Sequence, residues 1–149
     1  MKPGKDYIGV GLGAIITNDR GEILLMKRGP KCYNEVGAWA LIGGMLDFGE
    51  TLHQGIVREV IEETGLVVEV VEQFPAHDHI LPDEHQHWVG NVFVTRIVSG
   101  TPQIMEPEKC DALDWFALDN LPTPIAHMSQ YPIEYYRQKQ LTINSNMPN

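Results

Sequence analysis

The sequence predicts an α/β domain in which helices pack on a mixed β-sheet. Segments rich in β-branched residues, which are typical of strands, come before, between and after two segments of helical character. The hydrophobic share of 43% and the charged share of 21% are ordinary for a soluble globular protein. Because 149 residues suffice for one domain with a real core, we expect a single domain over 1–149, with its core at about 7–140.

The N-terminal part predicts three strands. Tyr7–Thr17 is rich in β-branched residues and glycine, and Glu22–Arg28 follows it after the turn residues Asn18–Gly21. A loop precedes a third short strand, Ala38–Gly44, which ends in a glycine pair. The "GVGLG" in the first strand has glycines like those of a dinucleotide-binding turn, but the final spacing and the following helix are missing, so we reject that interpretation.

A helix is expected next, followed by further strands and a second helix. The first helix should run from about Gly49 to Thr64, with Gly65 as its C-cap. The strands expected after it are 66–80, with a break near Pro75, then 87–98 and 112–118. A C-terminal helix over 128–141 is expected to tolerate Pro132 only in its first turn, and the tail 142–149 should be frayed.

Three glutamates crowd the end of the first predicted helix. At about 100° per residue, Glu59 and Glu63 fall on the same stripe as Leu52 and Ile56, which should face the core. Like charges four residues apart are unfavourable, and the helix dipole disfavours anions at this end. A solvated face with an Arg58–Glu62 ion pair is one explanation of this pattern. A bound divalent cation is the other, because carboxylate oxygens are ligands that Mg²⁺ prefers.

The residues upstream favour the cation. The stretch "GMLDFGETLHQGIVREVIEETGL", from Gly44 to Leu66, resembles the Nudix box, G-x5-E-x7-R-E-U-x-E-E-x-G-U with U aliphatic, at every fixed position. The similarity extends over roughly 7–122 and is greatest to the MutT-like, nucleotide-triphosphate diphosphatase branch of the Nudix hydrolases. This resemblance implies an α/β/α sandwich with a mixed sheet and a catalytic loop–helix–loop.

The same resemblance assigns roles to the residues of the box. It implies that Glu59, Glu62 and Glu63 hold Mg²⁺, with Mn²⁺ as the alternative, and that the Gly44 carbonyl adds a ligand. Arg58 would orient the acids by pairing with Glu50, and Glu59 would take the proton of the attacking water.

Residues outside the box are also candidates for catalysis or substrate binding, but the sequence patterns that indicate them are less specific. In some Nudix members the general base comes from a distant loop, and Glu106 and Glu108 are the candidates here, although both also fit ordinary loop acids. Lys27 and Arg28 end the second predicted strand, where a basic pair would bind phosphate oxygens or simply be solvated. Histidines at 77, 79, 85 and 87 would line a loop or the substrate mouth, with a zinc site as the less favoured alternative.

By this resemblance we expect a Mg²⁺-dependent hydrolase that converts (deoxy)nucleoside triphosphates to monophosphates and pyrophosphate. ADP-ribose hydrolysis is the main rival, because Pro82 lies 16 residues past Leu66, although Pro82 also suits a turn. A non-catalytic nucleotide-binding module is the rival from another class, and the intact acids of the box argue against it.

Charge and composition limit the partners. The formal net charge of −9 disfavours binding to a nucleic-acid duplex, which needs a basic face. We find neither an apolar run long enough to cross a bilayer nor a secretory leader, so we expect no membrane partner and a cytoplasmic location. The Nudix resemblance leaves a homodimer open.

Overall fold

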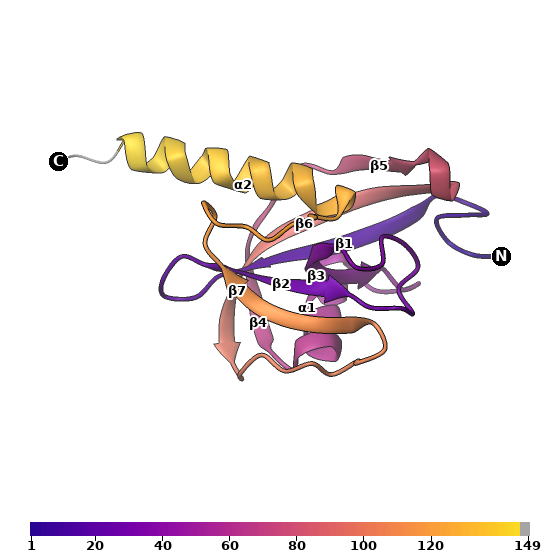
Figure 1. The fold of residues 1–149 in the computed structure, drawn as a ribbon, viewed down its shortest axis with the longest axis horizontal. Helices are drawn as coiled ribbons and strands as arrows, with labels where there is room; N and C mark the ends of the chain where they lie inside the picture. The colour runs from indigo at the N-terminus through magenta and orange to yellow at the C-terminus, as the bar shows by residue number, and fades with distance from the viewer. Residues whose placement is uncertain (147–149) are drawn as a thin grey trace.

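The computed structural model describes residues 1–146, and within them seven strands form one mixed sheet (Figure 1). The strands run in the order β4-β6-β1-β3-β2-β7, and β5 pairs with β6 outside this path. β1 pairs in parallel with β6, whereas the other pairs are antiparallel. The elements are β1 (Gly9–Ile16), β2 (Ile23–Arg28), β3 (Trp39–Met45), α1 (Leu52–Thr64), β4 (Val67–Gln73), β5 (His77–Leu81), a 3₁₀ turn (Pro82–Glu84), β6 (Gln86–Ser99), β7 (Cys110–Phe116) and α2 (His127–Asn146).

The two helices cover opposite faces of the sheet, which confirms the predicted α/β/α arrangement. Alternate residues of each strand point to opposite faces. In β2, Leu24 and Met26 pack in one core with Ile56 of α1, whereas Leu25 packs in the other core with Ile133 of α2. No described helix is long and apolar enough to span a membrane.

The first helix begins later than the sequence predicts. Thr51 is its N-cap and forms a capping box with Gln54, so the helix starts at Leu52 rather than at Gly49. Gly49 has a φ of 89°, a left-handed conformation that excludes it from the helix. At the other end, Gly65 adopts the expected left-handed C-cap with φ 75°.

The prediction for the C-terminal helix was wrong in two respects. Pro132 lies in the second turn of α2, not the first, and residues 142–146 continue the helix rather than fray; positions 147–149 lie outside the described residues. A proline at 132 cannot donate to the carbonyl of Met128 one turn earlier.

Candidate active site at the glycine pair of β3

The glycine pair at the end of β3, Gly43 and Gly44, lies between the acidic residues of α1 and a pocket on the other face of the sheet. Gly44 faces α1, and a side-chain Cβ there would overlap the carboxylate of Glu59. Gly43 precedes it on the strand and lines a pocket on the side of the sheet covered by α2. The acidic helix and the pocket are therefore neighbours across a single strand.

Arg58 organises the acidic helix. Its guanidinium donates to Glu50 through Nε (2.9 Å) and Nη2 (2.6 Å), which is the pair that the sequence predicts. Its Nη1 donates to Glu59 (2.8 Å) and Glu62 (3.1 Å), and Nη2 also reaches the carbonyl of Met45 (2.9 Å). One guanidinium thus joins the loop before α1 to Glu59 and Glu62 on the helix.

Glu50 is the strongest partner of Arg58. The hydrogen bonds from Arg58 lower the pKa of Glu50 to about 2, assisted by the backbone N–H of Asp47. Glu50 is therefore fully ionised at neutral pH and acts as an anchor for the guanidinium. It does not lie within the buried part of the acidic stripe.

Glu59 and Glu63 form that buried part. Burial raises the pKa of Glu59, although Arg58 opposes the shift. Burial also raises the pKa of Glu63 to about 8, and the charge of Glu59 acts in the same direction. The Oε2 atom of Glu63 is buried without a hydrogen-bond partner. Of these two carboxylates, Arg58 binds only Glu59, so the buried Oε2 of Glu63 has no cation in contact with it.

The loop between β6 and β7 brings one of its two candidate acids to this site. The charge of Glu106 contributes to the raised pKa of both Glu59 and Glu63, so its carboxylate lies near them. Glu108 instead pairs with Lys31 at 3.6 Å, and both side chains are largely exposed. The structure therefore brings Glu106, and not Glu108, into the acidic cluster.

Lys109 is a cation that sequence reasoning missed. Its Nζ lies 3.4 Å from Glu106, and the charge of Glu63 contributes to its raised pKa. Lys109 also lines a small cavity with Glu63 and Glu106. Nothing in the spacing of this loop marks the lysine that lies beside the two candidate acids.

The two basic residues at the end of β2, Lys27 and Arg28, place their side chains in different parts of the molecule. By strand alternation, Lys27 points to the face covered by α2, away from the glutamates on the α1 side. The ladder with β7 is irregular between Lys27 and Arg28. Arg28 contributes to the pKa of both Glu63 and His79, so its guanidinium lies between the acidic cluster and the pocket.

A buried hydrogen-bond network holds Arg28 in this place. Its Nε donates to the carbonyl of Asn34 (2.9 Å) and its Nη2 to Asn34 Oδ1 (2.8 Å). Asn34 in turn donates to Gln86 (2.9 Å), which also accepts from the indole N–H of Trp88 (2.8 Å). These bonds join the loop after β2 to the start of β6 and leave Nη1 of Arg28 outside them.

The pocket on the α2 side of the sheet has a glycine floor. Gly11 pairs with Gly90 across β1 and β6, and Gly13 pairs with Gly43 across β1 and β3. Its walls include aromatic, aliphatic and amide side chains, which come from the loop after β2, from β3, β5 and β6 and from the start of α2. No acidic side chain is among the described residues that line it.

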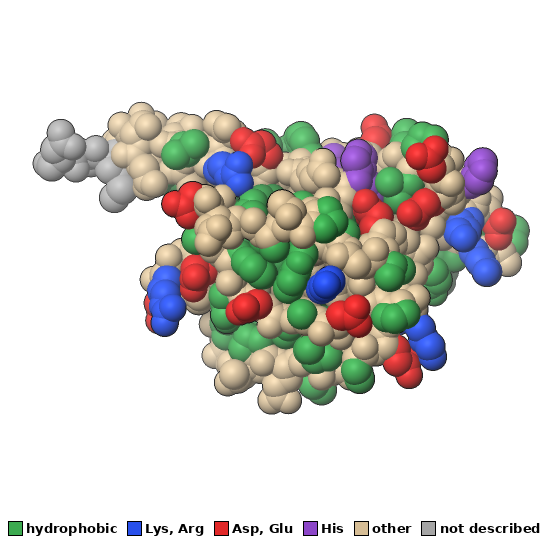
Figure 2. Space-filling model, in the orientation of Figure 1, with side chains coloured by type: hydrophobic (Ala, Val, Ile, Leu, Met, Phe, Trp, Pro, Cys, Tyr) green, Lys and Arg blue, Asp and Glu red, His purple; other side chains and the backbone are tan. Residues whose placement is uncertain are grey.

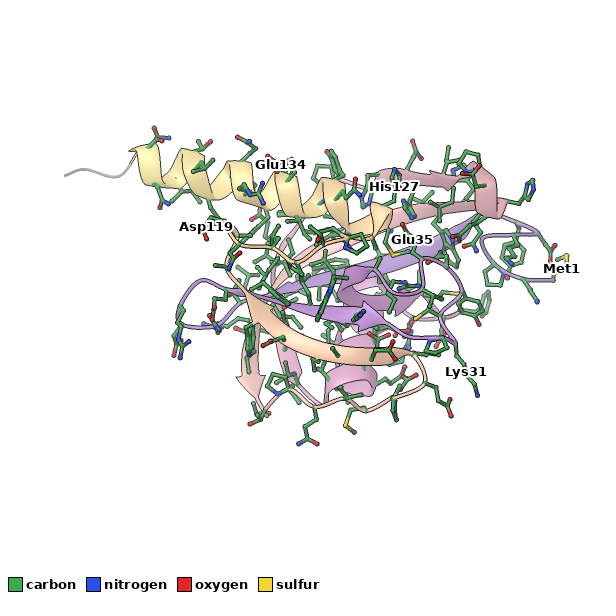
Figure 3. All side chains as sticks on the ribbon, in the orientation of Figure 1. Met1, Lys31, Glu35, Asp119, His127 and Glu134 are labelled. Atoms are coloured by element: carbon green, nitrogen blue, oxygen red, sulfur yellow. The ribbon has the colours of Figure 1, made fainter. Side chains whose placement is uncertain are left out.

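Two of the four histidines singled out in the sequence, His77 and His79, line this pocket, whereas His85 and His87 do not. His77 and His79 share a face of β5 and line the pocket. His79 is 3% exposed and stacks on His127, with their Nδ1 atoms 2.9 Å apart. Glu35 accepts a hydrogen bond from the backbone N–H of His127 (2.6 Å), and the two lie together at the start of α2 (Figure 3). Histidine is also visible at the surface there (Figure 2).

Comparison with known proteins identifies the family to which this fold belongs. The family model described as NUDIX domain matches residues 8–136. The chain belongs to the NUDIX family. The NUDIX chain is also similar to a solved structure, the MutT NUDIX hydrolase from Burkholderia pseudomallei, with 40% identity and a TM-score of 0.80 over 87% of this chain and 98% of that one.

Two curated relatives of this NUDIX chain carry different functional names. An ADP-ribose pyrophosphatase from Methanocaldococcus jannaschii is 32% identical over 113 residues, which are 76% of this chain and 64% of that protein. An NAD-capped RNA hydrolase, NudC, from Vibrio cholerae is 31% identical over 112 residues, which are 75% of this chain and 39% of that protein. This chain therefore spans less than two thirds of either relative.

The acidic residues of this NUDIX helix suit a divalent cation. The donors are carboxylate oxygens, which Mg²⁺ and Mn²⁺ prefer, and one of them, Glu63 Oε2, is buried without a partner. The carboxylates do not yet converge on one point, because Glu59 and Glu62 are bound to Arg58, and no preformed set of three ligands occurs among residues 1–146. The donor chemistry of these residues fits Mg²⁺ or Mn²⁺.

Proposed function

We propose that this NUDIX protein hydrolyses the phosphoanhydride bond of a nucleoside diphosphate derivative, with (deoxy)nucleoside triphosphates as the preferred class. The observation that carries the proposal is the Gly43–Gly44 pair, which has the buried acids on one side and the pocket on the other. A substrate with a polyanionic part and a less polar part suits two such adjacent environments.

The acidic residues would have different roles at the polyanionic part of the substrate: metal binding, positioning and proton transfer. Glu59, Glu62 and Glu63, together with the carbonyl of Gly44, would hold Mg²⁺ or Mn²⁺, which when bound neutralises phosphate charge and lowers the pKa of a water. Arg58 keeps Glu59 and Glu62 in place, and Glu50 keeps Arg58 in place. Glu59 is the proposed acceptor of the proton of the attacking water, with Glu106 as the alternative base.

Positive side chains near the acids would bind the phosphate oxygens. Arg28 lies between the acidic cluster and the pocket, and its Nη1 is outside the network that holds it. Lys109 lies at the same cluster beside Glu106. Arg28 is therefore a better candidate than Lys27, which is turned to the other face of the sheet, and Lys109 is added to the proposed set.

ADP-ribose is the second candidate substrate. The similarity to the Methanocaldococcus jannaschii ADP-ribose pyrophosphatase favours it. The position of Pro82 does not, because Pro82 starts the 3₁₀ turn between β5 and β6, is exposed and does not line the pocket. A turn accounts for this proline without any role in substrate choice.

A substrate panel tests the proposal. With Mg²⁺, we expect nucleoside triphosphates to yield monophosphate and pyrophosphate at a kcat/KM roughly tenfold or more above that for ADP-ribose, which would yield AMP and ribose 5-phosphate. Products are separated by ion-exchange chromatography, and a matched reaction with EDTA should be inactive. Faster turnover of ADP-ribose would support the second candidate, and no turnover of any compound would contradict the proposed activity.

A further inference from the structure

The pocket on the α2 side contains one glycine that the protein's own packing does not explain. A Cβ on Gly90 would run into the His77 ring, and one on Gly43 would run into the backbone of Leu12. A Cβ on Gly13 would press on Val92 at 3.3 Å. Gly90 and Gly43 are needed so that neighbouring atoms can occupy their present positions, and Gly13 leaves little room for a side chain.

Gly11 differs from them. A Cβ built there would lie 3.9 Å from the carbonyl oxygen of Val89 and 4.0 Å from the Trp88 ring, which are ordinary contacts. Its φ is not in the left-handed range, so alanine would fit without strain. Glycine inside a strand is normally a disadvantage, because it loses more conformational freedom on folding and packs no side chain. A missing side chain that the fold does not require points to a ligand that approaches the backbone closely.

The surroundings of Gly11 indicate the shape of that ligand. Gly11 lies beside Gly90 in the β1–β6 ladder, two residues before Gly13, so the floor near it is bare peptide backbone. The Trp88 ring stands at the side, held by its hydrogen bond to Gln86, and Leu41 and Val92 add apolar surface. A flat floor with an aromatic and aliphatic border fits a planar ring.

Three polar side chains of the pocket are engaged within the protein, whereas His79 Nε2 is buried without a partner and Arg28 Nη1 is outside its network, so few polar groups are available to a ligand. The side chain of Asn34 is bound to Arg28 and Gln86, and Ser129 Oγ accepts from the backbone N–H of Leu41. Asn91 donates to the carbonyls of Gly11 and Val89. A sugar presents several hydroxyls that need partners, whereas a heteroaromatic base needs few and buries apolar faces.

We propose that Gly11 is the residue that sets the depth of this pocket, and that the pocket takes the flat heteroaromatic base of the nucleotide. This inference rests on the proposed function, because it assigns the base to the pocket beside the acidic helix. It gives Gly11 and Gly13 of "GVGLG", a stretch that does not form a dinucleotide-binding turn, a different role as part of the floor of a base-binding site.

The test compares the wild type with Gly11→Ala and Gly11→Val. We expect Gly11→Ala to raise the KM for nucleoside triphosphates roughly tenfold, with kcat changed much less, since one added methyl group must be accommodated. Gly11→Val should raise KM further. The melting temperature of Gly11→Ala should be unchanged or higher, because the fold has room for the methyl group. Val10→Ala, a change on the opposite face of the same strand, is the control and should alter KM little.

Binding measurements separate this inference from the proposed function. By calorimetry without metal, AMP should bind Gly11→Ala more weakly than wild type, whereas ribose 5-phosphate should bind both alike. Equal AMP affinity, an equal loss for ribose 5-phosphate, or a lowered melting temperature of Gly11→Ala would each overturn the inference. Absence of hydrolysis by the wild type would overturn the proposed function, and the binding comparison would still decide the role of Gly11.

Discussion

Replacing Glu59 with glutamine is expected to lower kcat/KM for phosphoanhydride hydrolysis by roughly 10²- to 10⁴-fold, since the amide neither attracts a divalent ion nor accepts a proton as the carboxylate does. Glu59 is 9% exposed and its carboxylate lies against Gly44, so an isosteric amide occupies the same space. The melting temperature should change by only a few degrees, because the amide removes a buried charge while Arg58 keeps its bonds to Glu50 and Met45.

Glu134→Gln is the matched control for this substitution. Glu134 lies on α2, remote from the acidic helix (Figure 3), and pairs with Arg137 at 2.8 Å. Steady-state kinetics with Mg²⁺ should show wild-type turnover for Glu134→Gln. Retention of more than about a tenth of wild-type activity by Glu59→Gln would remove Glu59 from the essential residues and shift the proposed base to Glu106.

Replacing Arg58 with alanine should damage both stability and activity. Arg58 is largely buried, with 26% of its side chain exposed, and it binds Glu50, Glu59 and Glu62 together. Without it, partly buried carboxylates lose their cation, which should cost roughly 3 kcal/mol of the free energy of unfolding. Activity should fall at least about 100-fold, because the acids would no longer be held in place.

Urea denaturation and kinetics measure the two effects of Arg58→Ala. Arg58→Lys should recover part of the stability but little activity, because an ammonium group cannot reproduce the forked contacts of a guanidinium. Arg96→Ala is the control: Arg96 pairs with Glu69, its side chain is 71% exposed, and its loss should cost under about 1 kcal/mol. An Arg58→Ala protein as stable and active as Arg96→Ala would contradict the organising role of Arg58.

The acidic helix was predictable because its information is local. The spacing of Glu59 and Glu63 relative to Leu52 and Ile56 fixes their common stripe, and Ile56 and Glu59 are indeed buried. The C-cap at Gly65 needs nothing beyond the helix itself. The helix begins at Leu52 rather than at the predicted Gly49 because Thr51 and Gln54 form a capping box, and both residues of this box can be read from the sequence.

The pocket could not be predicted in the same way, since it depends on strand register. Nothing local places Gly11 beside Gly90, which lies 79 positions later in the chain, or Gly13 beside Gly43. Lys27 and Arg28 are adjacent in sequence, yet only their strand positions show that Lys27 faces away from the acids. Lys109 reaches Glu63 through the path of a loop that has no periodic pattern to read.

The most direct test of the central claim is the anomalous difference density of crystals grown with Mn²⁺. We predict a peak bonded to carboxylate oxygens of Glu59 and Glu63 at about 2.1–2.2 Å, which is typical of a small divalent cation with oxygen ligands. Well-ordered side chains in the last two turns of α1, with no peak among them in crystals of protein that turns over substrate with Mn²⁺, would contradict it.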